Sequence, residues 1–200
     1  MDLVNYVRIY NNVISDSFCD ELIKKFEDNP QQYLYQNRAN PDRNFKMSFN
    51  QIEIMLNEGW KEETKKLLDI FPEYVDRYRK DCNIFVNQWP LEWGYEYIRM
   101  KRYMPNGKEF YSPHVDCTRL GNCNRFLVFF LYLDNNSAGQ TSFPQLDVAS
   151  KCVKGSLLMF PPMWPWLHAG EPPVEKPKYI IGSYLHYVHY DRKNLVNNNV

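Results

Sequence analysis

Apolar residues recur at helical spacing in the first part of the chain. In residues 18–26 the apolar positions fall on one face, with lysine and glutamate on the other, which predicts an amphipathic helix. Ser15-Asp16-Ser17 offers N-caps just before it, and Asn29-Pro30 should end it. Residues 60–82 show the same pattern more clearly. Because Pro72 lacks a backbone N–H, we expect it to start a second helix or to kink the first.

The segments around these helices differ in character. Residues 6–14 are β-branched and aromatic and predict a strand. Residues 31–42 are polar and end in Asn40-Pro41, which predicts a loop. Residues 47–55 predict a further strand.

From residue 83 onward the helical period disappears, and short apolar runs alternate with clusters of Pro, Gly and Asn. These runs predict strands at residues 84–86, 95–103, 111–115, 125–133, 141–143, 151–153, 156–160, 166–168 and 178–187. Many short strands at close spacing are typical of a sandwich or a barrel. The pattern therefore predicts an α+β fold, mainly β, with the helices first.

The length of 200 residues fits one compact domain. Within it, we expect residues 1–82 to form a strand and helical support, residues 83–190 the functional core, and residues 191–200 a flexible tail. The longest apolar run, residues 126–133, is far too short to span a bilayer, so no membrane partner is expected. The oligomeric state stays open.

Charge and cysteine content narrow the function classes. The 24 Lys and Arg balance 24 Asp and Glu, so nucleic acid is not an expected partner. The five cysteines are irregularly spaced without a CxxC pair, which favours free thiols in a reducing compartment. The N-terminus lacks the basic and apolar regions of a signal peptide, so we expect a cytoplasmic protein.

A His-x-Asp pair, His114 and Asp116, lies at the end of one predicted strand. Residues i and i+2 of a strand point to the same face, so both side chains can reach one metal ion. A third ligand from a distant strand would complete a two-histidine, one-carboxylate face, which is typical of non-haem Fe(II) oxygenases. The pair alone is a weak signal, because such pairs also arise by chance.

A longer pattern surrounds this pair. In order, it contains Arg102-Tyr103-x-x-x-Gly107-x-x-x-Tyr111-x-x-His114-x-Asp116, Arg125, Leu131-Tyr132-Leu133-Asp134, Ala138-Gly139-Gln140-Thr141-Ser142-Phe143-Pro144, Val153-Lys154-Gly155-Ser156-Leu157-Leu158-Met159-Phe160, His168-x-Gly170-Glu171-Pro172 and Lys178. Over residues 97–188 the chain thereby resembles the 2-oxoglutarate- and Fe(II)-dependent dioxygenases of the prolyl 4-hydroxylase-like group. Ala138 and Gln140 replace the Gly and Glu of that group, so we expect the loop around them to differ.

The resemblance implies a double-stranded β-helix, a cupin-like jelly roll, backed by the N-terminal helices. It implies three iron ligands, His114, Asp116 and His168. It further implies that Lys178 pairs with the distal carboxylate of 2-oxoglutarate, and that Tyr103 and Tyr132 donate hydrogen bonds to this cosubstrate. A buried dicarboxylate needs a charge partner, because an unpaired buried charge is very costly. The cofactors would be Fe(II), 2-oxoglutarate and O2, with ascorbate as an optional reductant.

The substrate side is less defined. The candidates for its pocket are Arg125, Tyr111, Tyr184 and Trp166. Arg125 fits the group's substrate-side arginine, although a strand-edge arginine explains it equally well, and core packing is the stronger expectation for Tyr184. Specificity is expected in the loops at residues 87–94 and 117–124.

Other charged residues carry weaker signals. Half of a basic cluster would face the pocket at alternate strand positions, and this cluster comprises Arg99, Lys101, Arg102 and Lys108. His186 and His189 would face opposite sides of a strand, and we interpret both as structural or surface groups.

The expected activity is hydroxylation of a C–H bond in a prolyl residue of a peptide or protein, with decarboxylation of 2-oxoglutarate to succinate. Two alternatives stay open. The same chemistry could act on a small-molecule substrate such as a free amino acid or a nucleobase, or the chain could be a cupin-like domain that binds metal without turnover.

Overall fold

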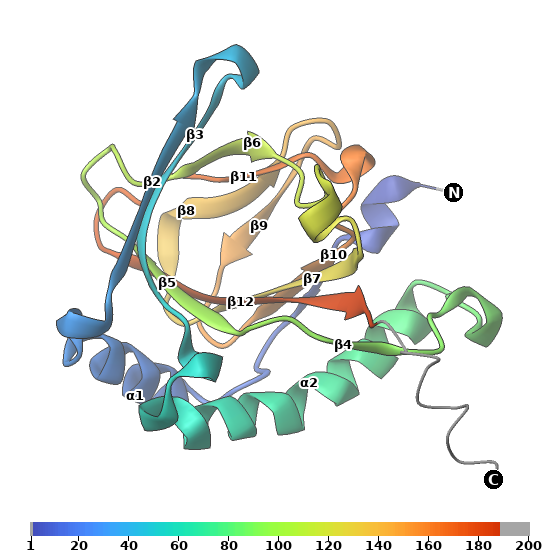
Figure 1. Cartoon of the computed structure of the whole chain (residues 1–200), viewed down its shortest axis with the longest axis horizontal. Helices are drawn as coiled ribbons and strands as arrows, with labels where there is room; N and C mark the ends of the chain where they lie inside the picture. The colour runs from blue at the N-terminus through green and yellow to red at the C-terminus, as the bar shows by residue number, and fades with distance from the viewer. Residues whose placement is uncertain (1, 189–200) are drawn as a thin grey trace, which may run out of the picture.

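The computed structural model describes residues 2–188, which form a curled antiparallel sheet with two helices on one side (Figure 1). The strands are β1 (Arg8–Tyr10), β2 (Leu34–Asn40), β3 (Phe45–Ile52), β4 (Trp93–Tyr95), β5 (Arg99–Tyr103), β6 (Tyr111–His114), β7 (Arg125–Tyr132), β8 (Asn136–Phe143), β9 (Val148–Cys152), β10 (Leu157–Phe160), β11 (His168–Gly170) and β12 (Lys178–Tyr187). The helices are α1 (Asp16–Glu27) and α2 (Lys61–Asp81).

Hydrogen bonds order the strands β1-β10-β7-β12-β5-β3-β6-β11-β8-β9, with β2 on β3 and β4 on β12. Strand β3 makes the corner of the sheet, because it pairs with β5 from Asn50 to Ile52 and with β6 at Met47. The sheet thereby folds over itself into a nearly closed barrel (Figure 1). The predicted mainly β jelly roll with helices behind it is confirmed.

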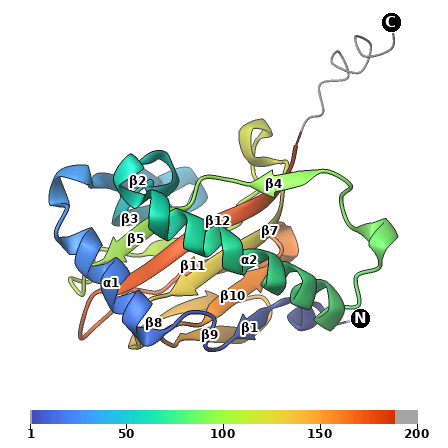
Figure 2. The same cartoon turned by 90° about the horizontal axis from the view of Figure 1, so that it is seen from below.

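The central strand β7 is buried on both faces. Leu127, Phe129 and Leu131 belong to the core shared with the helices, whereas Val128 and Phe130 belong to the core inside the barrel. Figure 2 shows α1 and α2 crossing the outer face of this part of the sheet. Because both faces are covered, this strand is apolar without the alternation of a half-exposed one.

Both helices lie where the sequence predicts them. Ser15 caps α1, since its Oγ accepts a hydrogen bond from the backbone N–H of Phe18. Leu67 and Phe71 of α2 are buried against the sheet. Pro72 lies exposed inside α2, which runs on without a break, so the prediction that a second helix starts there is wrong.

The segment at residues 31–42 is not the predicted loop. It contains β2, which pairs with β3 from Leu34 opposite Gln51 to Asn40 opposite Phe45. Backbone hydrogen bonds hold this hairpin, and most β2 side chains are exposed, so the strand carries no apolar pattern.

Among the described residues, the strand predicted at residues 84–86 is absent, and the one predicted at residues 166–168 starts later. Residues 84–86 lead into a short 3-10 turn at Val86–Gln88, and Trp164–Trp166 forms another before β11 begins at His168. Pro165 lies at the start of the second turn, where the fixed φ of proline suits a helical turn.

Strands β1 and β3 come from the region predicted as support, yet they hydrogen-bond within the sheet that carries the candidate site. The predicted tail at residues 191–200 lies outside the described residues. Among residues 2–188, no helix is long and apolar enough to cross a membrane.

Candidate metal and cosubstrate site

Three predicted metal ligands meet at one end of the barrel. His114 ends β6, Asp116 follows it by two residues, and His168 opens β11 directly opposite His114 in the antiparallel pairing. Their ligand atoms all lie within 4.8 Å of one another. Asp116 lies between the imidazoles, with its carboxylate oxygens 3.5 Å from Nε2 of His114 and 3.4 Å from Nε2 of His168.

Backbone carbonyls orient both imidazoles toward this point. Nδ1 of His114 donates to the Ser112 carbonyl at 2.8 Å, and Nδ1 of His168 donates to the Trp166 carbonyl at 3.1 Å. Such bonds leave Nε2 as the lone-pair donor. Oδ2 of Asp116 and Nε2 of His168 are buried without a hydrogen-bond partner. Two unsatisfied buried acceptors at this spacing fit a divalent cation, because a metal bond would supply the missing partner.

The protonation states also suit a metal. Burial and the neighbouring His114 lower the pKa of His168 to about 4, so this imidazole is neutral at pH 7. Burial by itself would raise the pKa of Asp116, but the two histidines and Arg125 hold it well below its usual range. A neutral imidazole and an ionised carboxylate are the forms that bind metal.

Lys178 lies at the start of β12, lines a narrow inner pocket together with His114 and His168, and is only 2% exposed. Burial lowers its pKa, and no carboxylate of the described residues forms an ion pair with it. A Cβ on Gly139 would lie 2.9 Å from Cδ of Lys178, so the glycine makes room for the lysine stem. A buried ammonium without a partner fits a ligand carboxylate.

Comparison with known proteins agrees with this chemistry. Residues 98–186 match the model of the 2OG-Fe(II) oxygenase superfamily. The chain carries a 2-oxoglutarate- and Fe(II)-dependent dioxygenase domain. No curated protein sequence matches the chain significantly.

Solved structures of prolyl hydroxylases share the fold of this dioxygenase. A viral collagen prolyl hydroxylase from Paramecium bursaria Chlorella virus-1, solved with 2OG, has a TM-score of 0.65 at 20% identity, covering 92% of this chain and 97% of its own. A Trichoplax adhaerens prolyl hydroxylase, in complex with a hypoxia inducible factor peptide fragment, has a TM-score of 0.69 at 19% identity, with coverage of 98% and 88%. A Pseudomonas putida prolyl-4-hydroxylase has a TM-score of 0.60 at 14% identity, with coverage of 92% and 94%.

The two tyrosines predicted to contact the cosubstrate of the dioxygenase differ in their surroundings. Tyr103 lines a narrow inner pocket together with Lys178, whose Nζ lies 5.3 Å from the centre of the tyrosine ring. Tyr132 is fully buried, and its hydroxyl already donates to Oγ1 of Thr141 at 2.8 Å and contacts Ser150. Donation from Tyr132 to a cosubstrate stays a prediction, and it requires exchange of one of these bonds.

A cavity of about 750 Å³ opens beside His114 and Asp116, which line its inner part. Three of the four predicted pocket residues line it, namely Tyr111, Arg125 and Tyr184. Tyr111 stacks on the His114 ring, with ring centres 3.6 Å apart. Trp166 does not line this cavity, because its indole packs against Tyr6 and donates to the Leu3 carbonyl, so the structure places it outside the predicted pocket.

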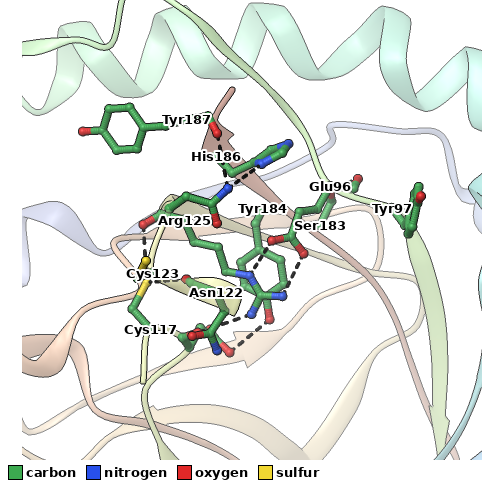
Figure 3. A network of polar contacts seen from close by, with 12 residues as sticks. Glu96, Tyr97, Cys117, Asn122, Cys123, Arg125, Ser183, Tyr184, His186 and Tyr187 are labelled. Atoms are coloured by element: carbon green, nitrogen blue, oxygen red, sulfur yellow. Dashed lines mark hydrogen bonds and ion pairs between the residues drawn. The ribbon is translucent and has the colours of Figure 1, made fainter. Parts of the chain in front are cut away.

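Arg125, Glu96 and Tyr184 lie together in one polar network (Figure 3). Arg125 makes two hydrogen bonds to the Glu96 carboxylate, at 2.6 and 2.7 Å, and its guanidinium lies 3.8 Å from the Tyr184 ring centre. Tyr184 in turn donates to Oδ1 of Asp116 at 3.0 Å, which leaves Oδ2 for a metal. Sequence reasoning missed Glu96, because no local spacing links it to Arg125.

The loops around the cavity also differ from expectation. The predicted loop at residues 117–124 contributes Thr118, Arg119 and Asn122, but no residue of 87–94 lines the cavity. The β2–β3 hairpin takes that place. Alternation along β5 sends Arg99 and Lys101 toward the cavity, as predicted for half of the basic cluster.

His186 lies outside the cavity and contacts the Asn124 amide at 3.0 Å, which agrees with a structural role. His189 lies outside the described residues.

Proposed function

We propose that this dioxygenase hydroxylates a prolyl residue in a peptide or protein. The observation behind this proposal is the His114–Asp116–His168 group, in which Oδ2 of Asp116 and Nε2 of His168 are buried without a hydrogen-bond partner. Beside it lies the buried Lys178, which forms no ion pair with a described carboxylate, and an open cavity adjoins the group. The prolyl assignment draws support from the prolyl hydroxylases that share the fold over almost the whole chain. One of those is solved with a bound peptide fragment.

Different residues would bind the metal and the cosubstrate. His114, Asp116 and His168 would hold Fe(II), and Lys178 would pair with the distal carboxylate of 2-oxoglutarate in the inner pocket. When bound, Fe(II), 2-oxoglutarate and O2 supply the oxidation. 2-Oxoglutarate yields succinate and CO2, and a C–H bond of the substrate becomes C–OH. Tyr184 keeps the Asp116 carboxylate aligned through its hydrogen bond.

The direct test is incubation with Fe(II), 2-oxoglutarate, O2 and a set of proline-containing peptides. We expect succinate to form in step with a mass gain of one oxygen on proline. Turnover only on a free amino acid or a nucleobase would contradict the prolyl assignment and leave the dioxygenase activity intact. Absence of succinate with every compound would favour a domain that binds metal without turnover.

We also propose a reducing compartment, the cytoplasm. All five cysteines are free thiols, and Cys19, Cys82 and Cys152 are buried. Reducing conditions keep such thiols unpaired. Thiol labelling of the denatured protein from intact cells should modify all five.

A further inference from the structure

The cavity above the metal ligands is strongly cationic, although the chain as a whole is neutral. Six cationic side chains line it, namely Arg38, Arg43, Arg99, Lys101, Arg119 and Arg125. Asp116, the metal ligand, is the only carboxylate among the described lining residues. This charge is therefore concentrated where a substrate would lie.

Two of the six cations already have acidic partners. Arg125 pairs with Glu96, and Arg99 lies 3.3 Å from a Glu53 carboxylate oxygen and 3.8 Å from Glu96. The other four, Arg38, Arg43, Lys101 and Arg119, form no ion pair with any described carboxylate. The three arginines are exposed at the cavity and Lys101 is buried in it, so a ligand that enters can pair with all four.

Lys101 is the innermost of these four. Only 9% of it is exposed, and Nζ lies between two aromatic rings, 5.0 Å from the Phe49 centre and 5.9 Å from the Phe130 centre. Burial lowers the pKa of Lys101 to about 8. Asp116 opposes this shift, whereas the nearby cations Arg99, Arg125 and Lys178 add to it. A bound anion would stabilise the protonated amine.

The two buried lysines face different spaces. Lys178 lines only the inner pocket, whereas Lys101 lines both the inner pocket and the outer cavity. Lys178 therefore suits the cosubstrate, and Lys101 stands where substrate and cosubstrate spaces meet.

We propose that the substrate is an acidic peptide segment, with one carboxylate on Lys101 beside the hydroxylated residue and further acidic side chains on the arginines of the rim. This inference rests on the proposed function. The rim arginines come from two segments, Arg38 and Arg43 from the β2–β3 hairpin and Arg119 from the loop after β6. Charges spread over two segments match several acidic groups along an extended chain.

A peptide fits this arrangement better than a nucleic acid. Nucleic acid carries its charge on outer phosphates, and a neutral base inserted toward the metal would leave Lys101 buried without a partner. A small dicarboxylate could pair with Lys101 but would leave the rim arginines unused.

The test compares peptides that differ only in Glu or Gln next to proline. For the wild-type protein we expect kcat/KM to be about 10- to 100-fold higher with Glu, the range of a charge-assisted hydrogen bond. Binding of fluorescently labelled Glu and Gln peptides, measured by anisotropy with Mn(II) in place of Fe(II), should likewise be tighter for the Glu peptide. Equal affinity for both peptides would overturn the inference, even if no succinate forms in the activity assay.

Lys101→Met should abolish the Glu preference, and Lys101→Arg should retain it. The Glu-to-Gln ratio is measured within each variant, so a smaller folded fraction does not mimic the effect. Lys80→Met on the exposed face of α2 is the matched control and should keep the wild-type ratio. Arg119→Gln should weaken binding by only ~2- to 5-fold at low salt, with the difference lost at high salt.

The possible failures are distinguishable. Absence of succinate with every substrate contradicts the proposed function, and the binding ratio still decides the inference. Hydroxylation of Glu and Gln peptides at equal rates contradicts the inference alone. Stronger stimulation of succinate formation by a single-stranded oligonucleotide or a small dicarboxylate than by any peptide would contradict the peptide class.

Discussion

At the scale of single residues, the site is defined by buried atoms that lack a partner. Oδ2 of Asp116 and Nε2 of His168 have no hydrogen bond, and Lys178 has no ion pair among the described residues. Leaving such groups unsatisfied costs about 1–3 kcal/mol each, and more when they are charged. A metal ion and a ligand carboxylate would supply the missing partners.

We expect His168→Ala to abolish stable metal binding. The variant loses one of three ligands, so its Mn(II) affinity should fall by more than the roughly 10- to 100-fold that loss of an orienting partner costs. Isothermal titration of Mn(II) measures the change. His186→Ala is the control, because this histidine contacts Asn124 outside the cavity, and it should bind as the wild type does. Equal weakening in both variants would contradict the ligand assignment.

Lys178→Met should remove the charge partner of 2-oxoglutarate. Loss of one member of a buried charge pair costs about 2–5 kcal/mol, so the Kd for 2-oxoglutarate should rise at least ~30-fold. Calorimetric titration of the Mn(II)-loaded protein measures this. Lys176→Met, which alters a lysine paired with Asp134 at the surface, should leave the Kd unchanged. An unchanged Kd in Lys178→Met would show that another cation holds the cosubstrate, for which Lys101 in the same inner pocket is the candidate.

At the scale of elements, each strand of the site has a second task in packing. β7 carries Arg125 at the cavity and presents Phe129 to Phe71 of α2, with ring centres 5.4 Å apart. β12 carries Lys178 at one end and Tyr184 near the other. The strands that carry the site are therefore also the strands that pack against the helices.

Pro72→Ala should stabilise the protein. Pro72 is exposed in the interior of α2, where proline cannot donate to the carbonyl four residues earlier. Alanine restores that bond, and we expect a gain of about 1–3 kcal/mol in the free energy of unfolding. Urea denaturation measures it, with Glu73→Ala as the exposed neighbouring control. A loss of stability would mean that the proline is accommodated in a local geometry that alanine does not improve.

At the scale of the whole molecule, the helical first part and the strand-rich second part share one core. β1 pairs with β10, and β3 joins β5 to β6 at the corner of the barrel. Met47 and Phe49 of β3 also line the cavity. The first 82 residues therefore contribute to the site as well as to its support.

We expect the fragment of residues 83–188 not to fold by itself. Without β3 the barrel lacks its corner, and without α2 the outer face of β7 exposes Leu127, Phe129 and Leu131. Such an apolar face favours aggregation. Near-UV circular dichroism and gel filtration check this, with co-expression of residues 1–82 as the rescue. A monomeric fragment with a cooperative melt would contradict the prediction.

The sequence by itself determined the chemistry and most local structure. The His-x-Asp spacing and the resemblance to 2-oxoglutarate- and Fe(II)-dependent dioxygenases singled out His114, Asp116, His168 and Lys178 as candidate ligands. Apolar periodicity located α1, α2 and the core strands, because a buried face repeats with the period of its element. These are short-range properties that can be read along the chain.

Tertiary structure decided what depends on contacts between distant residues. It paired Arg125 with Glu96, moved Trp166 away from the cavity, and made the polar segment at residues 31–42 into a cavity-lining hairpin. It also placed Lys101 in the same cavity as His114 and Asp116, without an ion pair to a described carboxylate. Burial and ion pairing depend on which strands become neighbours, and a neutral composition does not reveal that six cations line one cavity.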